Sequence, residues 1–179
     1  FTLLETLVGV SILIIAITAT FSATQNGLSS SIESKEQVTA YYLAQEAVEL
    51  VRNVRDANSL YSIQNPSTQR NWLYSLATVG DPCEFGKVCM VDALNSTFTS
   101  CATPATCSKL NRDTNLSSAT YGMYSYTSGP SWVATNYKRE IAITRVNSDE
   151  VLVTVTMTWS KGSFTKTFKI KETMLNWQS

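Results

Sequence analysis

Four cysteines are the residues of this sequence with the most evident chemistry, because thiols can either ligate a metal or pair as disulfides. Cys83, Cys89, Cys101 and Cys107 follow the pattern C-x5-C, eleven residues, C-x5-C. Zinc sites built from such pairs usually place about two to four residues between the ligands. Clustered cysteines in an exported domain favour disulfides, since that compartment is oxidising. We therefore predict two disulfides and no metal.

The sequence leaves the pairing of these cysteines open, since three connectivities are possible. In a nested arrangement Cys83 pairs with Cys107 and Cys89 with Cys101, which would fit one antiparallel register. In a local arrangement Cys83 pairs with Cys89 and Cys101 with Cys107, and each bond closes a short loop. Either arrangement would stabilise a loop-rich region by about 2–4 kcal/mol per bond.

No other residues form a recognisable catalytic constellation. The sequence contains no histidine, which removes the commonest general base and metal ligand. It also lacks a glycine-rich phosphate-binding loop. Two pairs of nearby carboxylates occur in the sequence, Asp149 with Glu150 and Glu46 with Glu49. A tight turn explains the first pair, and a solvated helix face explains the second. We predict that the protein is not an enzyme and needs no cofactor.

The charge balance gives no strong attraction to nucleic acid, because 14 basic and 14 acidic side chains leave a formal net charge of zero. Four lysines lie in or near one predicted hairpin and would form the basic patch of a DNA-binding filament. They are Lys161, Lys166, Lys169 and Lys171. Lysines in such places more often protect an edge strand from unwanted pairing. Nucleic acid is therefore an allowed partner, but not an indicated one.

Two triplets match the acceptor pattern for N-glycosylation, Asn95-Ser96-Thr97 and Asn115-Leu116-Ser117. Such triplets are common by chance, and many bacteria do not use them. The sequence gives no reason to assign a modification to either one.

The first 21 residues, FTLLETLVGVSILIIAITATF, hold a single charged side chain, Glu5, and no further charge occurs until Glu33. A helix needs roughly 20 apolar residues to cross a bilayer core, so this segment qualifies as a membrane helix. It lacks the basic region and the small-residue cleavage site of a removable signal peptide. The chain begins with Phe and not Met, which predicts that it is already processed.

Glu5 is the informative residue of this segment. A carboxylate inside an apolar helix costs several kcal/mol unless it is paired. The obvious partner is a free α-amine, which processing would expose at Phe1. Within one straight helix the two groups cannot easily neutralise each other. The amine of another copy can meet Glu5 if the helices pack side by side, shifted by about one turn.

The stretch FTLLETLVGVSILIIA resembles the mature N-terminus of type IV pilins and of the related pseudopilins of type II secretion. The matching features are Phe1, Thr2, Leu3, Leu4 and Glu5, followed by the apolar run. The resemblance implies cleavage just before Phe1 by a prepilin peptidase, N-methylation of Phe1, and storage in the cytoplasmic membrane. It also implies assembly into a helical filament by an ATPase-driven machine, with Glu5 aligning an incoming subunit through the amine of a neighbour's Phe1.

We expect a structural subunit of an extracellular type IV pilus filament, a homo-oligomer that meets an inner-membrane assembly platform. The alternative is a minor pilin or a type II secretion pseudopilin that initiates or tips a short filament. The threonine-rich run VTVTMTWS and the Trp near the C-terminus favour this alternative. A third class is a pilin that displays a binding site for DNA or a surface receptor.

A long helix is expected to carry this N-terminal segment. Residues 22–32 are small and polar, and we expect the helix to continue through them into 33–56. The second part has an apolar stripe at helical spacing, wide enough to cover a sheet. The stripe comprises Val38, Tyr41, Leu43, Ala44, Ala47, Val48, Leu50, Val51 and Val54. The whole helix would contain about 55 residues and span roughly 80 Å.

The middle of the chain is predicted to consist of loops with short helices and strands. Asn65-Pro66 predicts the start of a short helix through Trp72, Leu73 and Leu76, with Asn65 as its N-cap. Residues 83–120 contain the cysteines and are expected to be rich in loops. Residues 108–120 and 127–136 are expected to be loops around a short strand at Tyr121–Tyr126.

The C-terminal third predicts three strands, at 137–146, 151–160 and 164–171, with turns at 147–149 and 161–163. In the middle strand Val, Met and Trp side chains alternate with Thr, which predicts one buried face. We predict an antiparallel meander whose apolar face packs on residues 38–54. The closing residues Met174, Leu175 and Trp177 are expected to lie against the sheet edge.

The predicted fold class is therefore α+β, with a long N-terminal α-helix packed on a C-terminal antiparallel β-sheet meander and a disulfide-stapled loop region. This is also the arrangement that the resemblance to pilins implies. We expect two parts: a hydrophobic N-terminal helix, 1–32, in a membrane or filament core, and a globular head, 33–179. The head includes the second half of the long helix.

Overall fold

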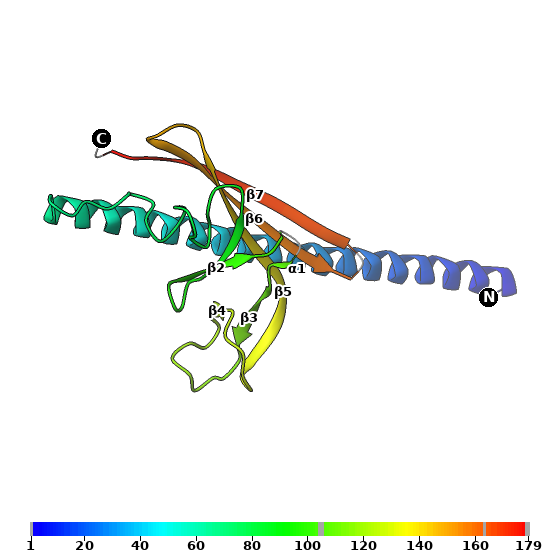
Figure 1. Cartoon of the computed structure of the whole chain (residues 1–179). Helices are drawn as coiled ribbons and strands as arrows, with labels where there is room; N and C mark the ends of the chain where they lie inside the picture. The colour runs from blue at the N-terminus through cyan, green and yellow to red at the C-terminus, as the bar shows by residue number, and fades with distance from the viewer. Residues whose placement is uncertain (1, 104–105, 163, 178–179) are drawn as a thin grey trace. The chain divides into compact units, whose positions relative to one another are not determined.

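The computed structural model describes residues 2–103, 106–162 and 164–177 of the chain. Phe1, for which methylation was predicted, and Ser163, which was assigned to a turn, lie outside the described residues. Contacts divide the chain into two units, Phe1–Thr39 and Ala40–Ser179. Helix α1 (Leu3–Gln64) contributes residues to both units, and the strands belong to the second (Figure 1).

The long N-terminal helix is confirmed. Thr2 begins it, because the backbone N–H of Glu5 is donated to the Thr2 carbonyl, at 3.0 Å, and lies 3.4 Å from the Thr2 hydroxyl. Residues 22–32 are helical, as predicted, although Gly27 lowers local helix propensity by about 1 kcal/mol relative to Ala. The helix is longer than expected and ends at Gln64 and not near residue 56.

The predicted helix after Asn65-Pro66 is wrong. Asn65 ends α1 instead of starting a new helix, since its backbone N–H and its side-chain amide are both donated to the Tyr61 carbonyl at 2.9 Å. Pro66 cannot continue the helix, because it has no N–H to donate. The segment that follows consists of turns, and Ser75 has a φ of 64°, which is incompatible with a right-handed helix.

The sheet of the second unit has seven antiparallel strands. They are β1 (Val88–Asp92), β2 (Thr97–Cys101), β3 (Lys109–Asp113), β4 (Tyr124–Ser125), β5 (Trp132–Arg145), β6 (Glu150–Lys161) and β7 (Phe164–Leu175). The three long strands β5, β6 and β7 form the predicted meander and lie side by side in Figure 1.

Strand β5 is the centre of the sheet. One of its edges pairs with β6, from Lys138 opposite Thr158 to Arg145 opposite Val151. The opposite edge pairs with β3 near the start of β5 and with β1 near its end, where Cys89 lies opposite Ile141. Strand β2 extends the sheet beyond β1, and β4 extends it beyond β3.

The core lies between one face of this sheet and the stretch of α1 that begins at Ala40. Strand β6 shows the predicted period of two, with its Val, Met and Trp side chains buried and its Thr side chains half-buried. Helix residues at the matching face are small or branched, which lets the sheet approach the helix backbone. The buried residues of α1 in this cluster are Ala40, Leu43, Ala44, Ala47, Val48 and Val51.

Several local expectations differ from the structure. Strands β1, β2 and β3 occupy a region predicted as loops, because short strands with mixed polarity carry no strong alternation. Strand β5 begins at Trp132, inside a predicted loop, and the strand expected at 121–126 is reduced to Tyr124–Ser125. In each case pairing with a neighbouring strand supplies backbone hydrogen bonds that the local sequence does not predict: β1 and β3 pair with β5, β2 with β1, and β4 with β3.

Some residues that were predicted to be buried, in the apolar stripe of α1 and at the C-terminus, are exposed. In α1, Val38 and Tyr41 are 52% and 46% exposed, although Tyr41 still makes a ring contact with Phe168. At the C-terminus Met174 is buried as predicted, whereas Leu175 and Trp177 are exposed. Leu175 is exposed because strand alternation directs it to the face opposite Met174.

Candidate functional site

The predicted assembly residue Glu5 lies in the first turn of α1 with an exposed side chain. Thr2 and Glu5 stand at the spacing of a capping box, in which a Glu three residues after the cap can reach back to the cap's N–H. No described residue forms a hydrogen bond or ion pair with the Glu5 carboxylate. Glu5 therefore places a carboxylate near the positive end of the helix dipole, where it can accept a hydrogen bond or form an ion pair with a further group.

The surface of the first unit is apolar and uncovered. Every residue from 2 to 32 is exposed, including large side chains such as Leu13, Ile15 and Phe21 at 59%, 67% and 64%. By length and composition, α1 is long and apolar enough to cross a membrane. Monomeric soluble proteins rarely expose so extended an apolar surface.

Five hydroxyl groups between Thr6 and Thr24 donate to the backbone of the helix itself. The side chains of Thr6, Thr18 and Thr24 donate to backbone carbonyls three or four residues earlier, at 3.0, 2.8 and 2.9 Å. Ser11 and Thr20 donate in the same way. These side chains add little polarity to the surface, because their hydrogens are already donated. Such a helix is suited to an environment without water.

The two disulfides are local: Cys83 pairs with Cys89, and Cys101 pairs with Cys107. The strand register explains why the nested alternative does not form. Cys101 lies opposite Val88, and Cys89 lies opposite Ser100, so Cys89 and Cys101 point to opposite faces of the β1–β2 hairpin. The predicted antiparallel register exists, but it is offset by one residue from the register that nested pairing needs.

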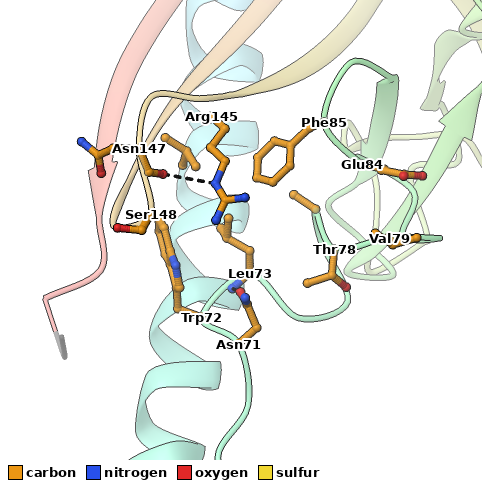
Figure 2. Close-up of a pocket in the computed structure, with 12 residues that line it drawn as sticks. Asn71, Trp72, Leu73, Thr78, Val79, Glu84, Phe85, Arg145, Asn147 and Ser148 are labelled. Carbon is orange, nitrogen blue, oxygen red and sulfur yellow. Dashed lines mark hydrogen bonds between the residues drawn. The ribbon is translucent and has the colours of Figure 1, made fainter.

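A cavity of about 270 Å³ opens between the segment after α1 and the turn that joins β5 to β6 (Figure 2). Arg145 reaches into it, and its Nε donates to the Asn147 carbonyl at 3.3 Å. The guanidinium group lies 5.7 Å from the centre of the Phe85 ring. No acidic residue in the described ranges forms an ion pair with Arg145. Glu84 also lines the cavity, and a hydrogen bond from Lys87 lowers its pKa.

The lining of this cavity combines a cation, an aromatic ring and a carboxylate. Arg145 offers a cation beside an aromatic ring, which suits a carboxylate or another small anion. Glu84 is engaged by Lys87 at 2.5 Å, so it is a poor general base. Within residues 2–103, 106–162 and 164–177, no group of three His, Cys, Asp or Glu side chains is placed to hold a metal ion.

Sequence reasoning missed a buried cation in the second unit. The Arg139 side chain is fully buried and donates to the carbonyls of Leu43 and Val91, at 2.7 and 2.6 Å. It also pairs with Glu46 at 2.6 Å. The interpretation of Glu46 as part of a solvated helix face missed this contact. Arg139 joins α1, β1 and β5, which is a structural role.

Two buried aspartates were also missed. Asp92 accepts hydrogen bonds from the Ser125 hydroxyl and the Asn95 side chain, at 2.8 and 2.9 Å. Asp113 accepts from the Thr120 hydroxyl at 2.6 Å and from the backbone N–H of Asn115 at 3.0 Å. The hydrogen bond from Thr120, followed by the one from Asn115, lowers the pKa of Asp113 to about 2. Both carboxylates order loops around the sheet.

The lysines considered for DNA binding lie on and beside β7. This strand pairs with β6 alone, so it is an edge of the sheet. Lys169 and Lys171 are exposed on its outer face, as expected of residues that protect an edge.

Comparison of the chain with protein-family models, with curated proteins and with solved structures finds no match in any of the three. What can be said of its function therefore follows from its own residues and their arrangement.

Proposed function

We propose that this protein is a structural subunit of an extracellular helical filament of the type IV pilus kind. The observation that carries the proposal is the uncovered apolar surface of residues 2–32, in a chain that begins with the sequence FTLLE. That surface needs a bilayer before assembly and neighbouring copies of the same helix afterwards. The second unit has its own core and would remain outside the bundle.

Glu5 would supply the specificity of this assembly. Lipid is as apolar as a helix bundle, so the hydrophobic effect alone does not favour leaving the membrane. A carboxylate in an apolar surrounding is stabilised strongly by an opposite charge. The α-amine of a neighbour's Phe1 is such a charge, and pairing with it would set the axial step between copies. In this account the precursor is stored in the cytoplasmic membrane, a prepilin peptidase exposes Phe1, and Phe1 is then N-methylated.

The test replaces Glu5 in two ways, because Glu5 stands at both a capping and a pairing position. Glu5→Gln retains the hydrogen-bonding ability of a capping box but removes the charge, whereas Glu5→Ala removes both. Each variant is supplied as the only copy in its cell, and filaments sheared from the surface are quantified. We expect both variants to lower filament yield at least tenfold, because each loses the charge pair. Glu36→Gln, a carboxylate change elsewhere in the first unit, should leave the yield unchanged.

Export and folding are checked separately by the two disulfides on a non-reducing gel. Normal filament yield from Glu5→Gln would overturn the charge-pairing role. Absence of the wild-type chain from sheared filaments would overturn the filament proposal and favour a plain membrane anchor. A trace of the chain, confined to filament tips or to the membrane fraction, would instead support the minor pilin or pseudopilin alternative.

A further inference from the structure

The two N-glycosylation triplets, which the sequence could not separate, lie in different structural settings. Asn115-Leu116-Ser117 is in the loop between β3 and β4, and Asn95-Ser96-Thr97 joins β1 to β2. Both asparagines are exposed, so exposure alone does not distinguish them. The hydrogen bonds of the side-chain amide do distinguish them.

The amide nitrogen of Asn115 is available. The Asn115 Oδ1 accepts from the backbone N–H of Ser117 at 3.0 Å, and the turn is closed by the Ser118 N–H, donated to the Asn115 carbonyl at 2.9 Å. This Asx turn holds the side chain of residue 115 over residue 117. Within the described ranges, the Asn115 Nδ2 has no hydrogen-bond partner. Leu116, at the centre of the triplet, is 79% exposed.

The amide nitrogen of Asn95 is engaged. Its Nδ2 donates at 2.9 Å to Asp92, a buried carboxylate that also accepts from Ser125. Ser96 has a φ of 51°, and Thr97 is already the first residue of β2, paired with Asp92. Attack by this nitrogen would require breaking a hydrogen bond to a charged group and releasing the end of a strand ladder.

We propose that Asn115 is an N-glycosylation acceptor and that Asn95 is not. The donor class is an oligosaccharide linked to a polyprenyl pyrophosphate. The Asn115 Nδ2 forms a bond to the anomeric carbon of the first sugar, and the bond from that carbon to the pyrophosphate oxygen breaks. Polyprenyl pyrophosphate leaves with the electron pair, and the amide loses one of its two protons to the transferase. No oxidant or reductant is needed. Use of this site in the cell rests on the proposed export of the second unit.

The experiment uses the purified, disulfide-bonded full chain in a mild detergent. It is incubated with a polyprenyl-pyrophosphate-linked oligosaccharide and an oligosaccharyltransferase that requires only the Asn-x-Ser/Thr triplet. Glycopeptides are then quantified by mass spectrometry. We expect occupancy at Asn115 to exceed that at Asn95 by about tenfold or more, because Asn95 must give up its bond to a carboxylate. Asn115→Gln and Ser117→Ala should abolish this modification, and Ser117→Thr should retain it.

A matched control removes any preference of the enzyme for one triplet. The paired changes Leu116→Ser and Ser117→Thr give the site at Asn115 the same triplet as the site at Asn95, and both changes fall on exposed residues. The excess at Asn115 should persist in this variant. Comparable or greater occupancy at Asn95 would overturn the proposal. So would an unmodified Asn115 while the enzyme modifies a standard acceptor peptide. Neither outcome depends on filament formation, so this test and that of the proposed function fail independently.

Discussion

The two stretches of α1, residues 3–39 and 40–64, belong to one continuous helix but differ in how far their side chains are buried. The first is rich in Leu, Ile and Val, and its residues up to 32 are exposed without exception. The second is less apolar, yet Ala40, Ala44 and Ala47 are fully buried against the sheet. Hydrophobicity alone therefore does not identify the part of this helix that forms the core.

The difference lies in where each stretch finds its partners. In the second unit, the Arg139 guanidinium donates to two backbone carbonyls, and Asp92 and Asp113 accept hydrogen bonds from side chains of the same unit. In the first unit, hydroxyls such as those of Thr6, Thr18 and Thr24 donate to the helix backbone, and no described residue pairs with the Glu5 carboxylate.

Among substitutions that test this comparison, the largest loss of stability in the second unit should come from replacing Arg139. Arg139→Ala removes two hydrogen bonds to the Leu43 and Val91 carbonyls and the ion pair with Glu46, and it opens a cavity, so we expect a loss of about 3–5 kcal/mol in the free energy of unfolding. The measurement is denaturant unfolding followed by tryptophan fluorescence, since Trp72 and Trp159 are buried in the second unit. Arg145→Ala, at an exposed arginine of the same strand, should cost less than about 0.5 kcal/mol. Equal losses for both would contradict the internal role of Arg139.

A smaller effect compares two leucines of the same helix. Leu43 is 6% exposed and Leu13 is 59% exposed. Leu43→Ala removes buried methyl groups and should destabilise the second unit by about 2–4 kcal/mol. Leu13→Ala should change the free energy of unfolding of the second unit by less than about 0.5 kcal/mol, because the Leu13 side chain is exposed and is not part of its core. The same tryptophan signal reports both, and a large loss from Leu13→Ala would show that the second unit depends on the first.

The smallest effect concerns acid stability. The pKa of Asp113 is lowered to about 2 in the folded chain, against roughly 3.9 for an unperturbed Asp. The unfolded state therefore binds the proton first, and the stability due to this group is lost as the pH falls from about 4 to about 2. Asp113→Asn should flatten the decline of the unfolding midpoint across that window. Thr120→Val, which removes the strongest donor, should flatten it as well. A decline as steep as in the wild type would assign the acid sensitivity to other carboxylates.

Local periodicity was enough to predict several features. The apolar run after Glu5 predicts a helix long and apolar enough to cross a membrane, and the alternation in 151–160 predicts a strand with one buried face. These patterns could be read because each repeats over many residues with a single period. Short strands such as β1 and β3 carry too few residues for a period to stand out.

The arrangement of the candidate sites depended on the tertiary structure. The sequence indicated that four cysteines form two disulfides, but the pairing followed from a strand register that is offset by one residue from nested pairing. It assigned the same glycosylation pattern to Asn95 and Asn115, and the two were distinguished only by the hydrogen bond from Asn95 to Asp92. Arg139 looked like any charged residue of a strand until α1 and β1 brought two carbonyls to it. The sequence by itself determined the long helix, the three long C-terminal strands and the apolar surface, because those depend on neighbours along the chain. The tertiary structure decided pairing, burial and availability, because those depend on atoms that the chain brings together from distant positions.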